Sequence, residues 1–131
     1  MIGVDTNVLV RYLIQDDPAQ TAVAKRFLET ELDEKRPGFV SLVVLAETVW
    51  VLRRLYAVPP AILVETVREL LDIGQLHVEQ RAAVLRALNR IGQKNADWVD
   101  ALIAEIAVEA GCTRIVTFDR GAAKLGMELL K

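Results

Sequence analysis

Short apolar segments alternate with longer segments of helical periodicity along the whole chain of 131 residues. The expected strands are 2–4, 39–40, 76–78 and 114–118, and the last residues form a further edge strand. The expected helices are 6–13, 18–28, 42–55, 60–71, 82–91, 96–110 and 121–125. Strands that alternate with helices form a parallel sheet that helices cover on both faces. We therefore predict one α/β domain over residues 1–131, with three α/β/α layers around a short parallel sheet.

Several predicted helix ends coincide with residues that favour such ends. Asp17 is a good N-cap, and Pro18 fits the first helical position because a backbone N–H would be unpaired there. Ser41 can cap the helix after the second strand, and Gly111 suits a left-handed C-cap. These residues support the boundaries that the hydrophobic pattern indicates.

Two acidic residues directly follow predicted strands. Asp5 comes after the strand at 2–4, and Asp119 comes after the strand at 114–118. In sheets of this kind, binding sites form at the carboxyl ends of the strands. Both carboxylates are expected at that edge, although either residue can instead serve as the N-cap of the helix that follows it.

Two further acids interrupt helices that are otherwise apolar. The helix around Glu47 is apolar on nearly its whole circumference, so Glu47 is expected to be shielded from bulk water. Asp100 lies in a similar apolar run, and Asp97 precedes it by three residues on the same helical face or caps that helix. A buried carboxylate is costly without a partner, and neither apolar stretch contains a lysine or an arginine.

Carboxylates that converge on one sheet edge repel each other, and a divalent cation relieves that repulsion. Oxygen ligands favour magnesium or manganese over zinc, and the sequence has no cluster of histidine and cysteine. Ions held in this way can activate water and stabilise a leaving oxygen. The acids therefore predict a Mg²⁺ or Mn²⁺ site suited to phosphodiester hydrolysis.

Four motifs in order resemble those of a PIN domain, and more narrowly those of a VapC-type toxin ribonuclease. They are VDTNVLVR at 4–11, VVLAE at 43–47, ADWVDALIA at 96–104 and IVTFDR at 115–120. The resemblance covers essentially the whole chain. It implies a PIN-like fold and metal-dependent cleavage of RNA that leaves 3′-hydroxyl and 5′-phosphate ends. It also implies a homodimer and a partner antitoxin that blocks the site.

The resemblance also implies a role for particular residues. The main metal ligands are Asp5, Glu47 and Asp100, and Asp119 completes the set directly or through water. The supporting residues are Thr6, Asn7, Asp97 and Thr117. Asp97 is a supporting acid, Asn7 acts through its amide, and the threonines hydrogen-bond to carboxylates. For both threonines, local capping is the alternative.

Contacts to RNA are less clearly marked in the sequence. Arg11 and Arg120 lie near acid motifs and are candidates for phosphate contacts, with Arg53, Arg54 and Lys94 as further candidates. Solvated surface charge is the alternative for each of them. The chain has two Trp, two Tyr and three Phe, and several fit core positions, so no stacking platform for bases is predicted. The single histidine, His77, is expected to be structural.

Charge and cysteine content bear on the cellular setting. The net charge of −2 does not indicate a nucleic-acid partner and does not exclude one. The single cysteine, Cys112, rules out an internal disulfide, is expected to be a small buried hydrophobe, and indicates a reducing compartment, the cytoplasm. No apolar run approaches the roughly 20 residues of a membrane span, and no signal peptide is expected.

Three alternatives remain. A receiver-like signalling domain also carries acids at strand ends, but it requires an acid pair after the first strand and a lysine after a late strand, and neither is present. A non-catalytic PIN-like protein-binding module would have no use for an intact set of acids. A DNA nuclease differs only in substrate, because metal-assisted phosphodiester chemistry does not distinguish the sugar.

Overall fold

The structure, a computed structural model, describes residues 1–91 and 96–131. The chain divides into two units, Met1–Glu79 and Gln80–Lys131. The elements of the first unit are β1 (Ile2–Gly3), α1 (Thr6–Leu13), α2 (Pro18–Arg26), the π-helical turn η1 (Phe27–Glu31), β2 (Gly38–Val40), α3 (Leu42–Leu55), α4 (Pro60–Leu71) and β3 (Leu76–Val78). Strands and helices thus alternate as the hydrophobic pattern predicts.

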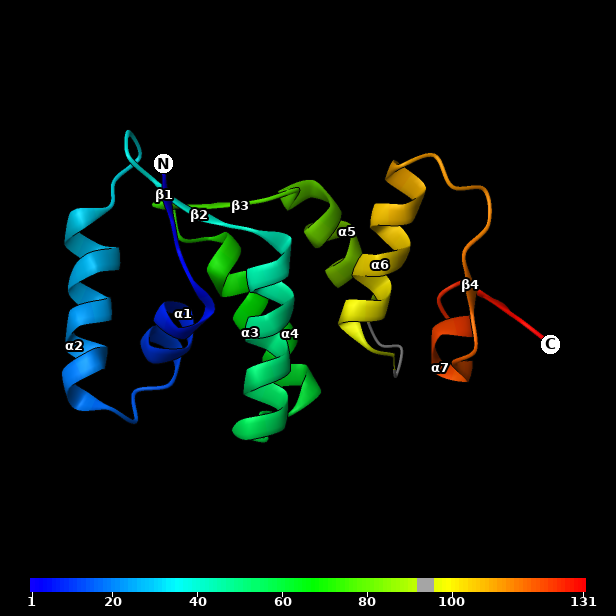
Figure 1. Ribbon diagram of the computed structural model, residues 1–131, viewed down its shortest axis with the longest axis horizontal. Coiled ribbons are helices and arrows are strands. Elements are labelled where there is room, and N and C mark those ends of the chain that lie inside the picture. Colours follow the sequence, from blue (N-terminus) through cyan, green and yellow to red (C-terminus); the bar gives the residue numbers. More distant parts are fainter. Residues whose placement is uncertain (92–95) are drawn as a thin grey trace. The chain divides into compact units, whose positions relative to one another are not determined.

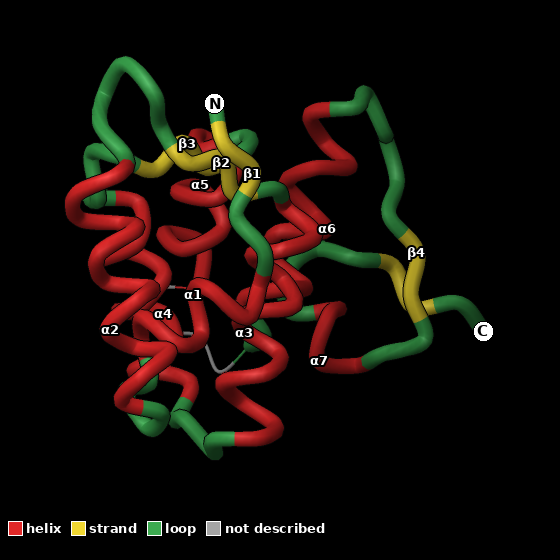
Figure 2. Tube along the Cα trace, turned by 60° about the vertical axis from the view of Figure 1, so that its left-hand side comes forward, coloured by secondary structure: helices red, strands yellow, loops and turns green. Residues whose placement is uncertain are grey.

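The three strands of the first unit form a parallel sheet in the order β1-β2-β3. Figures 1 and 2 show the helices of this unit on one side of the strands. The side chains on that side are buried, with Val4 5% exposed, Val40 1% and Val78 3%. The parallel sheet and the mixture of helices and strands confirm the predicted fold class.

Residues Gly3, Phe39 and His77 form one row across the other face of this sheet. The register pairs Gly3 with Phe39 and Phe39 with His77. Gly3 and His77 are exposed, and Phe39 is half-buried. Successive strand residues point to opposite faces, so this row lies opposite the buried valines.

Side-chain caps fix where the helices of the first unit begin. Asp17 accepts a hydrogen bond from the backbone amide of Gln20 at 3.1 Å, and Pro18 is the first residue of α2. Ser41 accepts one from the amide of Val44 at 3.1 Å at the start of α3. Both predicted caps are therefore confirmed.

The second unit contains α5 (Arg81–Ile91), α6 (Trp98–Glu109), β4 (Val116–Thr117), α7 (Arg120–Ala123) and β5 (Glu128–Leu129). Strands β4 and β5 pair in parallel as a separate two-stranded sheet. Gly111 has a φ of 92° after α6, which confirms the predicted left-handed helix end. None of the described helices is long and apolar enough to cross a membrane.

In the second unit, the structure corrects the sequence interpretation of the last predicted strand and of Cys112. The strand predicted at 114–118 is only two residues long, because only Val116 and Thr117 pair with a partner strand. Cys112 is exposed rather than buried, since it follows the helix end at Gly111 in an irregular segment whose backbone runs over the surface.

Candidate active site

Asp5 lies at the junction between β1 and α1. The amide of Val4 donates to the carbonyl oxygen of Phe39 at 2.9 Å, so the pairing of β1 with β2 continues up to Asp5. Asp5 is the N-cap of α1, and its Oδ1 accepts a hydrogen bond from the amide of Thr6 at 2.7 Å. The residue is exposed, so the carboxylate at this edge of the sheet is open to solvent.

Thr6 joins Asp5 to Glu47. The side chain of Thr6 is buried, and its Oγ1 donates a hydrogen bond to Oε1 of Glu47 on α3. The amide of the same residue is bonded to Asp5. Two carboxylates from distant parts of the sequence are therefore held beside one threonine.

The expected shielding of Glu47 from water is wrong. Glu47 is exposed, and so are Val43 (77%) and Trp50 (55%), four residues before it and three after it on α3. The buried face of α3 contains Leu45 and Val49 instead. Because α3 is apolar around its circumference, its sequence does not reveal which side faces the core.

Asp97 and Asp100 occupy the start of α6. Asp97 is the N-cap, and its Oδ1 accepts hydrogen bonds from the amides of Val99 at 2.7 Å and Asp100 at 3.4 Å. The capping role considered for Asp97 is thus confirmed. Asp100 is half-buried in the first helical turn, where the amide dipoles favour a negative charge.

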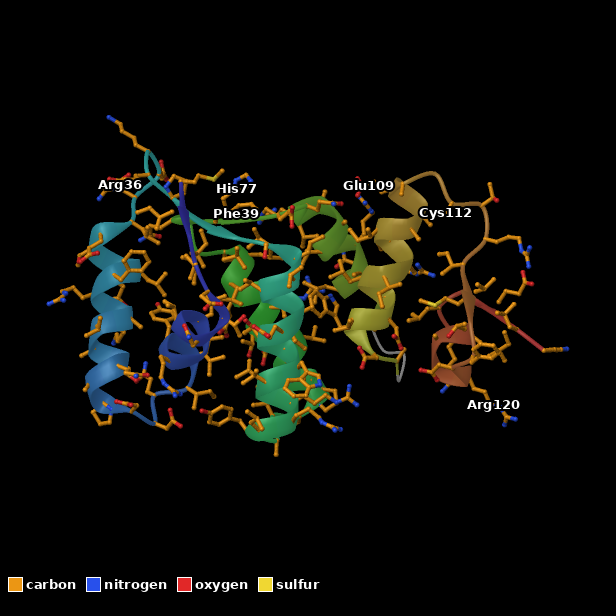
Figure 3. The ribbon with its side chains drawn as sticks, viewed as in Figure 1. Arg36, Phe39, His77, Glu109, Cys112 and Arg120 are labelled. Atoms are coloured by element: carbon orange, nitrogen blue, oxygen red, sulfur yellow. The ribbon has the colours of Figure 1, made fainter. Side chains whose placement is uncertain are left out.

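Asp119 follows β4 and caps α7. Its Oδ1 accepts a hydrogen bond from the amide of Gly121 at 2.8 Å, and its own amide donates to Oγ1 of Thr117 at 3.0 Å. Thr117 therefore supports the backbone of Asp119 rather than its carboxylate. Arg120 is exposed and extends away from α7 (Figure 3).

Comparison with known proteins identifies the class of this fold. The family profile of the PIN domain matches residues 2–127. The chain belongs to the PIN-domain family. The family is one of nucleases, and all five acids lie within the matched region.

Two other comparisons accompany the family match. A solved structure similar to this PIN domain is the crystal structure of Mycobacterium tuberculosis VapC20, described as a sarcin–ricin loop cleaving toxin. The two are 20% identical, the similarity covers 97% of this chain and 96% of that chain, and the TM-score is 0.46. No curated protein gives a significant match.

Each unit of the PIN domain contributes acids to the predicted site. Asp5 and Glu47 are held together in the first unit, whereas Asp97 and Asp100 share the first turn of α6 in the second. In residues 1–91 and 96–131, no group of three or more Asp, Glu, His or Cys side chains is arranged to hold a metal ion. The chemistry of the donors nevertheless fits a hard divalent cation, because all are carboxylate oxygens.

Arg11 is engaged by the protein itself. Its Nε donates to Oε1 of Gln20 at 2.6 Å, its Nη1 donates to the hydroxyl of Tyr56 at 3.2 Å, and it forms an ion pair with Asp16 at 3.5 Å. The hydrogen bond that Arg11 donates to Tyr56 raises the pKa of Arg11, and the charge of Asp16 adds to that rise. Arg11 thus ties α1 to α2 and to the end of α3.

The other predicted contacts to RNA remain predictions. Arg120, Arg53 and Arg54 are exposed, and Lys94 lies outside the described residues. Asn7 is exposed near the start of α1, one residue after Thr6. These positions are compatible with contacts to a ligand and do not by themselves identify one.

Sequence reasoning missed Glu79, an acid at the end of β3. Its Oε1 accepts a hydrogen bond from the amide of Leu42 at 2.8 Å, so it caps α3 together with Ser41. Because β1 and β3 are parallel, Glu79 and Asp5 lie at the same edge of the sheet. The signal was available, since Glu79 directly follows a predicted strand as Asp5 does.

Acids in this chain also have purely structural roles. Glu105 lies in the apolar α6 and is 13% exposed, and it pairs with Arg86 at 3.1 Å and Arg90 at 3.3 Å. The interaction with Glu105 raises the pKa of Arg86. A buried carboxylate needs a partner, and for Glu105 the partners are Arg86 and Arg90 of α5 rather than a metal ion.

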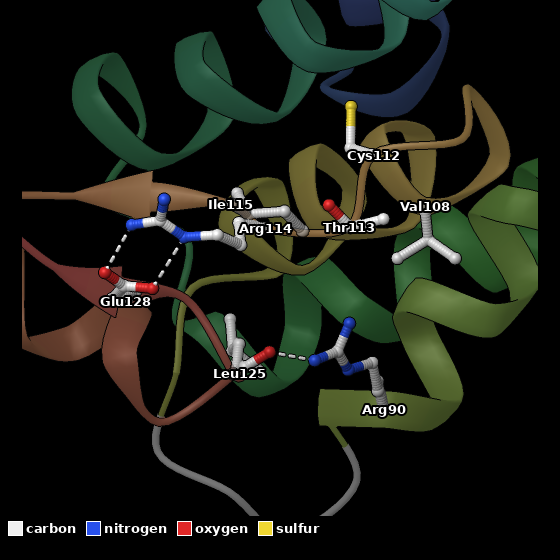
Figure 4. Close-up of a pocket in the computed structure, with 9 residues that line it drawn as sticks. Arg90, Val108, Cys112, Thr113, Arg114, Ile115, Leu125 and Glu128 are labelled. Carbon is white, nitrogen blue, oxygen red and sulfur yellow. Dashed lines mark hydrogen bonds and ion pairs between the residues drawn. The ribbon is translucent and has the colours of Figure 1, made fainter.

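The second unit contains a cavity of about 260 Å³ (Figure 4). Its lining includes Arg90, Cys112, Arg114 and Glu128 and none of the predicted site residues. Arg90 donates to the carbonyl oxygen of Leu125, and Arg114 pairs with Glu128 at 2.6 Å. Both arginines are therefore bonded within the second unit.

Proposed function

We propose that this PIN domain is a metal-dependent endoribonuclease that hydrolyses RNA phosphodiester bonds, and that it is the toxin of a VapC-type toxin–antitoxin pair. The observation that carries the proposal is the bridge from Asp5 through Thr6 to Glu47. The family match supports the nuclease class. The order of the four acid motifs supports the VapC-type assignment.

Asp5, Glu47, Asp100 and Asp119 would hold Mg²⁺ or Mn²⁺, which supplies Lewis-acid stabilisation of the phosphate and of the leaving 3′ oxygen. The chain orients these acids through its own hydrogen bonds. The amide of Thr6 donates a hydrogen bond to one oxygen of Asp5, and the amide of Gly121 donates one to one oxygen of Asp119. The second oxygen of each carboxylate is left for a ligand. Asp5 or a neighbouring acid accepts a proton from the attacking water, and the products carry 3′-hydroxyl and 5′-phosphate ends.

This assignment requires residues 1–131 to act as a single domain. Asp5 and Glu47 belong to the first unit, and Asp100 and Asp119 to the second. If all four bind the same ion, Asp5→Asn and Asp100→Asn each weaken one and the same Mn²⁺ binding event. Calorimetric titration with Mn²⁺ measures that effect without RNA.

The proposal includes the setting in which the enzyme acts. RNA is the substrate, a cognate antitoxin blocks the site, and the active form is a homodimer in the cytoplasm. A single cysteine agrees with a reducing compartment. The partners rest on the resemblance of the motifs, and sedimentation of the purified chain tests the dimer.

The deciding experiment is RNA cleavage by the purified full chain, freed of any partner, in Mg²⁺, Mn²⁺ or EDTA. Asp5→Asn and Glu47→Gln are compared with wild type on structured and unstructured RNA. Asparagine caps a helix about as well as aspartate, so Asp5→Asn removes a charge and keeps α1. Glutamine at position 47 still accepts the hydrogen bond from Thr6.

Matched controls are Asp17→Asn, which alters the N-cap of α2, and Glu69→Gln on the exposed surface of α4. The proposal expects metal-dependent cleavage that both site variants abolish and both controls retain. Cleavage that persists in EDTA, or in either site variant, contradicts it. Mn²⁺ binding without cleavage of any RNA would favour the non-catalytic binding module.

A further inference from the structure

We propose that Glu79 is a positioning residue for Glu47. Its carboxylate anchors the start of α3 to the end of β3 and thereby fixes how α3 presents Glu47. The inference rests on the proposed function, because Glu47 is a metal ligand there. Every residue involved belongs to the first unit, Met1–Glu79.

The first anchor joins α3 to the third strand. Glu79 directly follows β3, and its amide donates a hydrogen bond to the carbonyl oxygen of Val40, the last residue of β2, at 2.9 Å. Its Oε1 accepts a hydrogen bond from the amide of Leu42, the first residue of α3, at 2.8 Å. A carboxylate is a strong acceptor for such an amide, and the helix dipole favours its charge at this end. Glu79 therefore binds the chain on both sides of Ser41.

The second anchor joins α3 to the first strand. Thr6 lies just beyond β1, and its hydroxyl donates a hydrogen bond to Oε1 of Glu47. Glu47 follows Leu42 by five residues, about 7.5 Å along the helix axis, so both anchors act within the first two turns of α3. Strand β2, from which α3 continues, lies between β1 and β3 in the sheet. The helix is therefore held from the two strands that flank the strand before it.

Burial of apolar surface does not by itself fix the rotation of α3 about its axis. Leu45 lies on the buried face, but Val43 and Trp50 place large apolar side chains elsewhere on the same helix. A rotation by one residue, about 100°, would therefore exchange one apolar face for another and carry Glu47 away from Thr6. Hydrogen bonds with defined partners at both anchors select one rotation.

Three substitutions at position 79 separate the length of the side chain from its charge. Glu79→Gln keeps an oxygen at the same distance from the backbone and removes the charge. Glu79→Asp keeps the charge on a side chain about 1.5 Å shorter, and Glu79→Ala removes both. If Glu79 positions α3, Glu79→Gln resembles wild type and Glu79→Asp is impaired. If its charge simply attracts the cation, the order of these two variants is reversed.

The first measurement is the Mn²⁺ affinity of the full chain, by calorimetric titration without RNA at a temperature where every variant is folded. We expect Glu79→Ala and Glu79→Asp to weaken Mn²⁺ binding by about 10-fold, the lower end for loss of a group that orients a metal ligand. Asp17→Ala is the matched control, because it removes a side-chain cap of the same kind from α2. It should lower stability and leave Mn²⁺ affinity unchanged.

Two results of this titration overturn the inference. One is a loss of Mn²⁺ affinity in Asp17→Ala as large as that in Glu79→Ala, which would show that any weakened helix start has the same effect. The other is wild-type affinity in Glu79→Asp together with weak binding in Glu79→Gln, which would assign the effect to charge.

The second measurement needs neither metal nor RNA. Urea denaturation compares wild type, Glu79→Ala, Thr6→Val and the double variant. Substitutions at separate, independent contacts have additive effects on the free energy of unfolding. Two anchors of one helix do not, because the second holds α3 less firmly once the first is lost. The double variant should therefore lose less stability than the sum of the single losses, and additive losses overturn the inference.

Failure of the inference is distinguishable from failure of the proposed function. If Glu47→Gln binds Mn²⁺ like wild type, Glu47 is not a metal ligand and the proposed function fails, while the urea experiment still decides whether Glu79 positions α3. If Glu47→Gln loses Mn²⁺ binding but Glu79→Ala and Glu79→Asp do not, the metal site stands and Glu79 has no positioning role.

Discussion

The hydroxyl of Thr6 donates a hydrogen bond to the carboxylate of Glu47, which lies 41 residues further along the chain. The bond connects the first turn of α1 to the middle of α3. The same threonine binds Asp5 through its backbone amide. One residue thus contacts both acids, Glu47 through its hydroxyl and Asp5 through its backbone amide.

Replacing Thr6 with valine keeps its shape and removes the hydroxyl. On the proposed function, we expect Mn²⁺ affinity and RNA cleavage to fall by about 10- to 100-fold, as is typical when a group that orients a metal ligand is lost. Calorimetry and cleavage rates measure the two effects. Thr6→Ser restores the donor, so a serine variant as impaired as the valine variant would contradict the assignment.

Gly38→Ala should destabilise the first unit by about 1–3 kcal/mol through overpacking. A Cβ on Gly38 would lie 2.8 Å from Cδ1 of Leu32, 3.0 Å from Cγ2 of Val4 and 3.1 Å from Cδ2 of Leu76. Urea denaturation measures the change. Gly3→Ala, in the same sheet, is the control and should leave stability nearly unchanged, because a Cβ at Gly3 meets no atom within 4 Å. Equal effects of the two variants would contradict this account.

Arg11 is expected to be a structural residue rather than a phosphate contact, because Tyr56, Gln20 and Asp16 engage its guanidinium group. Tyr56→Phe and Arg11→Gln should therefore lower thermal stability by a modest amount, since the ion pair is substantially exposed. Neither should change the salt dependence of RNA binding. A slope of log K against log[salt] whose magnitude falls by about one in Arg11→Gln, which removes the positive charge, would show a lost phosphate contact instead.

Glu128 should make stability depend on acid pH. The hydrogen bond and the charge of Arg114 lower the pKa of Glu128 below its ordinary value in the folded state. The folded chain therefore binds this proton less readily than the unfolded chain, and the stability gained above the unfolded pKa, about 4.3, is lost as pH falls through the lowered value.

The thermal midpoint of Glu128→Gln, measured from neutral to acid pH, should decline less on acidification than that of wild type. Glu65→Gln, which removes an exposed acid on α4, controls for the loss of one charge. If the thermal midpoints of wild type and Glu128→Gln fall equally on acidification, the ion pair with Arg114 does not contribute to stability.

The sequence predicts best what short-range chemistry determines. The starts of α2 and α3 follow from Asp17 with Pro18 and from Ser41, and the end of α6 follows from Gly111. Each of these signals acts within one helical turn. These three helix ends could therefore be predicted without knowledge of the packing.

Features that depend on packing were predicted less well. The exposure of Glu47 was missed because α3 is apolar on all sides, and its orientation is set by the elements around it. The length of β4 was overestimated, because a strand requires a partner and β5 pairs with β4 over two residues only. The row of Gly3, Phe39 and His77 depends on the register of three strands that are far apart in the sequence.

The candidate site also combines features that the sequence reveals with features that depend on packing. Its acids could be identified from their positions after strands and within apolar runs, and the structure places Asp5 at the expected edge. The link between Asp5 and Glu47 could not be derived, because it depends on the approach of α1 to α3. The convergence of Asp5, Glu47, Asp100 and Asp119 on a metal ion remains a prediction.

The order of the two units along the chain also has a consequence for synthesis. A nascent polypeptide that has emerged from the ribosome only as far as Glu79 holds Asp5 and Glu47 but neither Asp100 nor Asp119. At ordinary translation rates, the remaining residues follow within a few seconds. On the proposed function, the nuclease thus stays inert beside the messenger RNA that encodes it until translation is nearly finished.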